Sequence, residues 1–135
     1  MALDLSAYGI KKTVNLSYDQ AIATVKDTLK EEGFGVLTEI DVKQTLKKKL
    51  DKDFTKYIIL GACNPNLAFQ ALTDEIDIGL LLPCNIVVYE NPSDQKTVVG
   101  AIDPASMVKV TGRDDLDQFA SMVKEKLTRA INAVA

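Results

Sequence analysis

The sequence of 135 residues contains no histidine, no tryptophan, only two cysteines and no long hydrophobic run. Without histidine the chain cannot build a Ser-His-Asp or Cys-His catalytic site, a histidine zinc site or a histidine proton relay. Any acid–base chemistry must therefore use Asp, Glu, Lys, Tyr or Cys. The most apolar stretch, residues 78–89, is interrupted by Pro83 and Asn85. It is shorter than the roughly 20 residues that a membrane-spanning helix needs.

The amino-terminal residues and the charge balance exclude further classes of protein. No basic segment is followed by an apolar run, so no secretory signal is recognisable. We therefore expect a soluble, cytoplasmic protein whose cysteines are reduced. The net charge of −3 shows no general excess of Lys and Arg that could neutralise phosphates. We expect neither a nucleic acid nor a membrane as a partner, and the residues indicate no cofactor.

The overall composition is that of an ordinary globular domain. Apolar residues make up 47% of the chain and charged residues 26%, which is close to the average for globular proteins. A chain of this length can bury about two thirds of the surface of its unfolded state, so it needs neither a disulfide nor a metal to fold. No linker and no internal repeat divides it. Residues 1–135 are predicted to form a single domain.

Five segments have the composition and alternation of β-strands. They are residues 10–16, 34–40, 55–62, 84–89 and 97–102. A turn cluster joins the last two, which are therefore expected to form a hairpin. This hairpin interrupts the strict alternation of strands and helices and favours an antiparallel or mixed sheet. The predicted fold class is α+β, with a five-stranded, mostly antiparallel sheet covered by helices.

The helices are predicted from their caps and their apolar stripes. Ser17 and Gln20 form a capping box ahead of a helix that ends at Gly33. Three shorter helices follow N-cap residues, and two of them have proline at their first position. They are expected over residues 42–50, from 65 to about 73–77, and for a short turn from 104. The last helix begins near Asp114, and its apolar residues fall within about one third of its circumference.

Three segments together carry a family resemblance. They are GFGVLTEIDV at residues 33–42, ILGACNP at residues 59–65 and IGLLLPCNIVV at residues 78–88. The sequence resembles the prokaryotic domain-of-unknown-function 302 family, from about Tyr8 to the last helix. This resemblance implies a β-α-β4-α fold like that of the TATA-binding protein, with extra short helices, and a homodimer. It implies no reaction and no catalytic residues, and the fold by itself does not license DNA binding.

Cys63 and Cys84 are the first candidates for a functional site, and each is followed by Asn. Cys63 precedes a predicted helix, whose positive dipole end favours a thiolate that could be a nucleophile, a redox group or a metal ligand. The spacing of the two cysteines matches neither CxxC nor a zinc pattern. Two thiols without histidine make an incomplete metal site, although a dimer could bring four together. The structural alternative is that both are small buried hydrophobic residues.

Three polar residues accompany the cysteines. Asn64 could hold a ligand through its amide, or could only cap the following helix. Asn85 enters an apolar strand and needs hydrogen-bond partners, so it could line a pocket. Glu39 and Asp41 could do acid–base work if burial separated their pKa values, although Asp41 is also a cap. The candidate pocket residues are then Glu39, Cys63, Asn64, Cys84 and Asn85. No metal site and no catalytic residue is assigned.

These residues leave more than one function open. The first is a dimeric protein that binds a small ligand or a partner, which the absence of histidine favours over catalysis. The second is a thiol-dependent enzyme or a redox protein that uses Cys63, Cys84 or both. The third is a structural protein without a pocket. A concave, neutral pocket would favour the first, and an exposed, reactive Cys63 would favour the second.

Overall fold

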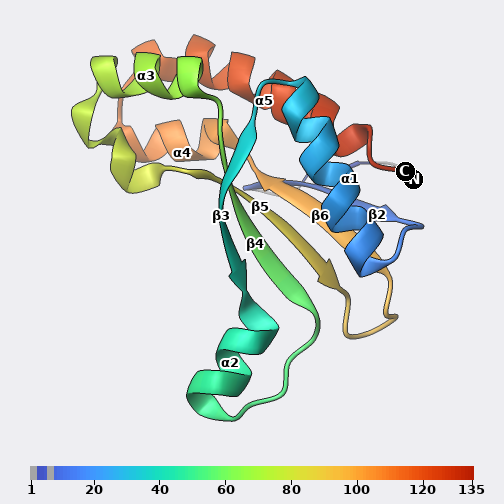
Figure 1. Cartoon of the computed structure of the whole chain (residues 1–135). Helices are drawn as coiled ribbons and strands as arrows, with labels where there is room; N and C mark the ends of the chain where they lie inside the picture. Colours follow the sequence, from blue (N-terminus) through green and yellow to red (C-terminus); the bar gives the residue numbers. More distant parts are fainter. Residues whose placement is uncertain (1–2, 6–7) are drawn as a thin grey trace.

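In the described residues, 3–5 and 8–135, six strands form one antiparallel sheet (Figure 1). The strand order in this computed structural model is β1-β2-β6-β5-β4-β3, and every neighbouring pair runs antiparallel. The strands are β1 (Asp4–Leu5), β2 (Gly9–Val14), β3 (Gly35–Asp41), β4 (Tyr57–Cys63), β5 (Cys84–Glu90) and β6 (Thr97–Ile102). The α+β class and the antiparallel sheet predicted from the sequence are confirmed.

The sequence predicted five strands, and the sheet of the described residues has six. The additional strand β1 has two residues and pairs with β2, with Asp4 opposite Lys11 and Leu5 opposite Ile10. Two residues are too few to show an alternation of apolar and polar side chains, so pattern reasoning cannot detect such a strand. It extends the edge of the sheet without changing the class of the fold.

The helices are α1 (Tyr18–Glu31), α2 (Val42–Leu50), α3 (Pro65–Asp74), α4 (Pro104–Thr111) and α5 (Asp117–Asn132), with the short 3-10 helices η1 (Ile76–Leu81) and η2 (Asp114–Leu116). Helices α1 to α4 begin directly after their predicted N-caps, whereas the last helix, predicted from near Asp114, starts as a 3-10 turn there and becomes α-helical at Asp117. The capping box of α1 is present, because the Gln20 amide donates to the Ser17 hydroxyl and the Ser17 amide donates to the Gln20 side chain. None of the helices in the described part of the chain is long and apolar enough to cross a membrane.

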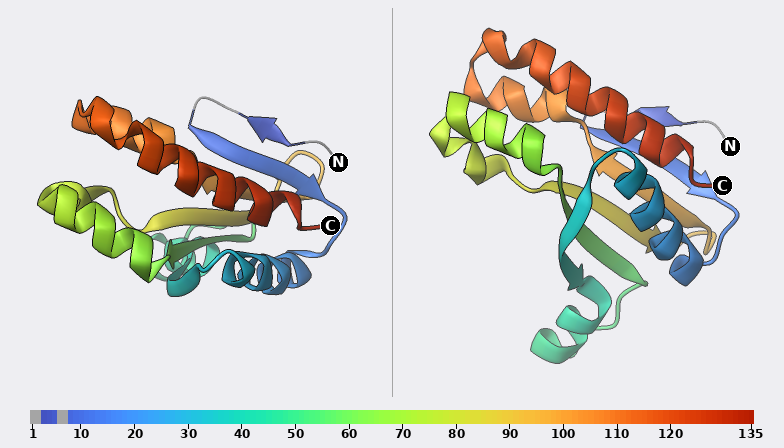
Figure 2. Two further views of the ribbon diagram at one scale, coloured as in Figure 1. Left: turned by 90° about the horizontal axis from the view of Figure 1, so that it is seen from above. Right: turned by 45° about the horizontal axis from the view of Figure 1, so that its top comes forward.

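The main core lies between one face of the sheet and the helices α1 and α5, which pack side by side (Figure 2). The strands contribute Ile10, Leu60 and Ile86, whose side chains are fully buried. Leu127 and Ile131 of α5 are also fully buried. The apolar stripe predicted for the last helix therefore faces the core, and burial of this stripe holds the helix on the sheet.

A second, smaller core lies beyond one end of the sheet, where α3, η1, α4 and α5 meet (Figure 1). Its buried members are Ala71, Ile78, Val108, Leu116 and Ala120. Leu82 and Phe119 pack against both cores. These two side chains connect the two cores. The candidate site lies where the cores meet.

Candidate functional site

An apolar cavity of about 380 Å³ lies between the two cores. Its walls come from the start of β3, the end of β4 and the start of β5, together with α3, η1, α4 and α5. Phe34, Ala62 and Val123 belong to the main core, whereas Ala71 and Val108 belong to the smaller one. None of the residues that line the cavity is charged. The walls therefore offer van der Waals contacts and no ion pairs.

The cavity opens to solvent on one side. Its exposed lining residues are Leu37 and Thr38 of β3 and Gly79 of η1, and the other lining residues are buried or half-buried. The opening therefore lies between the start of β3 and η1. A molecule can reach the cavity there without unfolding of the main core.

Asn64 lies in the cavity wall, but its side chain already has two partners. Its Oδ1 accepts from the Leu67 amide at 3.4 Å and caps α3, and its Nδ2 donates to the Glu32 carbonyl at 3.4 Å. Gly33 allows this approach, because a Cβ there would lie 2.8 Å from Asn64 Nδ2, and its φ of +85° favours glycine. The structure thus agrees with the capping interpretation of Asn64 and leaves its amide little freedom to hold a ligand.

Cys63 and Cys84 line the same cavity and are not joined by a disulfide. Cys63 is half-buried, whereas the Cys84 side chain is buried against the main core. Burial, with a smaller contribution from Cys63, raises the pKa of the Cys84 thiol to about 11. Cys84 is therefore a neutral thiol near pH 7, which makes it a poor nucleophile and a suitable lining for an apolar site.

Gly61 allows β3 and Pro83 to approach β4 closely at the cavity. A Cβ at Gly61 would lie 2.1 Å from Thr38 Oγ1 and 2.7 Å from Pro83 Cγ. The β3–β4 register shifts between Val36 and Thr38, which places Thr38 opposite Gly61. Sequence reasoning did not identify this contact. A glycine inside an otherwise apolar strand was the signal that could have found it.

Two of the candidate pocket residues lie elsewhere. Glu39 is exposed, and its carboxylate pairs with Lys26 Nζ of α1 at 3.0 Å. Asn85 is exposed on the face of the sheet opposite to Cys84, because successive residues of a strand point to opposite faces. Neither residue lines the cavity. Of the five residues, the structure brings together Cys63, Asn64 and Cys84.

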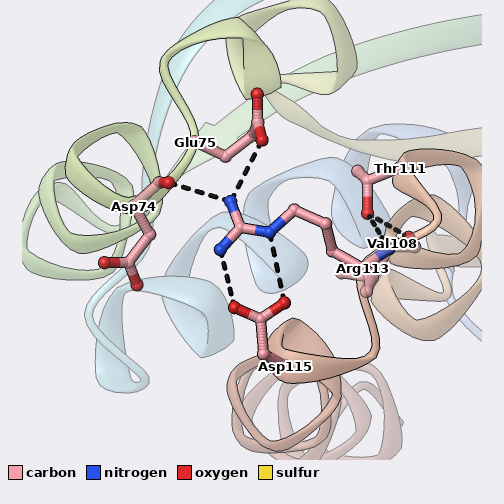
Figure 3. A network of polar contacts seen from close by, with 6 residues as sticks. All are labelled: Asp74, Glu75, Val108, Thr111, Arg113 and Asp115. Carbon is pink, nitrogen blue, oxygen red and sulfur yellow. Dashed lines mark hydrogen bonds and ion pairs between the residues drawn. The ribbon is translucent and has the colours of Figure 1, made fainter.

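A network around Arg113 holds the outer wall of the cavity in place (Figure 3). The Arg113 guanidinium donates to the Asp74 carbonyl at 2.8 Å and to the Glu75 carboxylate at 3.0 Å. Its other nitrogens donate to both oxygens of Asp115, at 3.2 and 2.6 Å. These hydrogen bonds lower the pKa of the Asp115 carboxyl below its ordinary value. One side chain thereby connects the end of α3 to the segment between α4 and α5.

No cluster of three or more Cys, Asp or Glu side chains that could hold a metal ion occurs among residues 3–5 and 8–135. Whether a dimer would bring four thiols together stays a prediction. The arrangement is therefore a cavity with apolar walls and two thiols, one of them buried.

Comparisons with known proteins agree with the resemblance seen in the sequence. No protein of curated function matched the chain. A crystal structure of an uncharacterised conserved protein DUF302 from Bacillus stearothermophilus has a TM-score of 0.88 and 29% sequence identity, and the match covers 94% of this chain and 98% of that chain. The family described as domain of unknown function DUF302 matches residues 10–134. The chain therefore belongs to the DUF302 family.

Proposed function

We propose that the protein binds a small apolar molecule in the cavity between its two cores. The observation that carries this proposal is an uncharged cavity of about 380 Å³ with an opening between β3 and η1. This volume lies in the range of small-molecule sites in proteins, which are also lined mainly by apolar side chains. Apolar walls offer an apolar ligand dispersion contacts that polar groups would not improve.

Filling the cavity tests this proposal. Ala68 lines the cavity on α3, and Gln70 is exposed on the same helix without lining it. Ala68→Trp is expected to weaken binding of the uncharged fluorescent probe N-phenyl-1-naphthylamine by at least about tenfold, and Gln70→Trp by less than about twofold. The measurement is a fluorescence titration of each folded variant. Equal affinities of the two variants would place the probe elsewhere and contradict the proposal.

Thiol chemistry on the bound molecule is the second candidate, because both cysteines line the same cavity. Cys63 is the more accessible of the two. The raised pKa of Cys84 argues against a nucleophilic role for that residue. A cytoplasmic location, which we also propose, would keep both thiols reduced.

A thiol reagent separates the two candidates. If the protein only binds its ligand, Cys84 is expected to stay unreactive near pH 7 and to react faster as the pH rises toward about 11. The rate of labelling of each cysteine is measured by mass spectrometry in the native protein, with the urea-unfolded protein as the control. Fast labelling of Cys63 alone near neutral pH would favour the thiol-dependent reading instead.

We further propose that the protein is a homodimer, formed through the face of the sheet opposite to α1 and α5. Alternation along the strands places Tyr57 and Tyr89 on this face, where their rings stack with centroids 5.1 Å apart. Ile40 lies in β3 and is exposed by 50%. Phe54 lies just before β4 and is exposed by 45%. An exposed apolar and aromatic surface of this kind is typical of a protein interface.

A further inference from the structure

We infer that the molecule bound in the cavity has an apolar body and carries no negative charge, as in a long-chain alcohol, an ester or a hydrocarbon, rather than a fatty acid. This inference rests on the proposed function and specifies its ligand. It follows from the chemistry of the cavity wall and from the charges beside the opening.

The interior of the cavity offers no partner for a carboxylate. Its lining contains no Lys and no Arg. The amide of Asn64 is already engaged with Leu67 and Glu32, and the Cys84 thiol is neutral near pH 7. In the described part of the chain, every buried side-chain nitrogen or oxygen has a hydrogen-bond partner. Burial of an unpaired carboxylate is strongly unfavourable, so an anionic group would have to remain outside.

The opening is no better suited to an anion. It is bounded by Leu37 and Thr38 on one side and by Gly79 of η1 on the other. The segment from Pro65 to Leu81, which forms α3 and η1, contains Asp74, Glu75 and Asp77 but no Lys or Arg. Asp77 is exposed two residues before Gly79. A carboxylate held at the opening would therefore be repelled by a charge of the same sign.

Of the basic side chains on the neighbouring elements, Lys30 of α1 lines a separate depression beside Phe34, and the others are paired or lie outside the cavity lining. Arg113 is bound by Glu75 and Asp115. Lys124 of α5 pairs with Asp103 at 3.0 Å, and Lys26 pairs with Glu39. Lys109 of α4 is exposed, and Met107 and Val108, not Lys109, line the wall. The cavity thus accepts an apolar body and disfavours an anionic head, both inside and at its opening.

Ligands with a ten-carbon chain and different head groups test the inference. Decanol, decanoate and decyltrimethylammonium are titrated at pH 7.5 against the protein loaded with N-phenyl-1-naphthylamine, below their micelle concentrations. Decanol is expected to displace the probe at concentrations at least about tenfold lower than decanoate. Decanoate that binds as tightly as decanol would overturn this inference and leave the proposed function standing. Failure of the probe and of all three ligands to bind would overturn the proposed function itself.

A charge reversal at the opening provides the second measurement. Asp77→Lys is expected to tighten decanoate binding by about three- to fivefold and to leave decanol within about twofold. Asp53→Lys makes the same change of charge at an exposed position between α2 and β4, outside the cavity lining, and is expected to change neither ligand. Equal effects of the two substitutions on decanoate would show a general charge effect and would contradict the role of the opening.

Discussion

Asn64 serves two segments of the chain at once. Its carbonyl oxygen caps α3, and its amide nitrogen donates to the Glu32 carbonyl at the end of α1. Gly33 has to be small and left-handed for this contact to form. At the residue scale, the polar side chain of Asn64 therefore stabilises the backbone around the cavity. The cavity that it helps to enclose stays apolar.

Leu127 tests the packing of the main core at a single residue. It is fully buried on α5, so Leu127→Ala is expected to lower the free energy of unfolding by about 2–5 kcal/mol. Met122→Ala, at a position exposed by 38% on the same helix, is expected to cost less than about 1 kcal/mol. Urea denaturation followed by circular dichroism measures both values. A loss below about 1 kcal/mol for Leu127→Ala would show that its site collapses without a cavity.

At the scale of elements, α3 and η1 form a wall that is attached separately from the sheet. They contribute Ala71 and Ile78 to the smaller core, and the end of α3 is connected to Arg113 (Figure 3). Phe69, Ile76 and Leu80 on the same segment are exposed by 75–87%. Few buried contacts and several exposed apolar side chains are the features of a segment that can open locally.

Arg113→Met tests this attachment. Loss of the bonds to Asp74, Glu75 and Asp115 is expected to speed amide hydrogen exchange in α3 and η1 by about tenfold, while exchange in β4 and β5 stays unchanged. Lys26→Met removes the exposed pair with Glu39 and is the control, with little expected effect on α3. Exchange measured by mass spectrometry that is identical in the wild type and in Arg113→Met would show that the smaller core alone holds the wall.

At the scale of the whole molecule, helices α1 and α5 cover one face of the sheet (Figure 2). The opposite face carries the stacked Tyr57 and Tyr89, and Ile40 lies on it by the register with Ile59. A sheet can bury one face on its own helices and leave the other for a partner. This division of faces is the physical basis of the proposed homodimer.

Light scattering after gel filtration tests the homodimer. The wild type is expected at twice the chain mass of 14.7 kDa, and Ile40→Glu is expected to shift the protein toward monomer, because it places a charge in the apolar interface. Val110→Glu makes the same change at a residue exposed by 75% on α4 and is expected to keep the dimer. A dimer that persists in Ile40→Glu, or a monomeric wild type at about 100 μM protein, would contradict the proposed interface.

Local signals in the sequence were enough to predict the strands other than β1, most of the helix caps, the α+β class and the family. The Ser17 capping box, the Asn64-Pro65 helix start and the α5 stripe each depend on residues within a few turns of one another. Such local patterns can be recognised without knowledge of the tertiary contacts. The pairing of β4 with β5, which brings the two cysteines together, came only from the structure.

Only the tertiary structure decided the site itself. Asn85 lies on the face opposite to Cys84, and Glu39 pairs with α1, because strand alternation and strand register set these directions. The cavity arises where α3 and η1 pack against α4 and α5 and leave space beside the sheet. Unfilled space depends on how distant segments fit together, and no short stretch of sequence encodes that fit. The absence of histidine excluded familiar chemistry from the start, whereas the packing of two cores determined where the cavity lies.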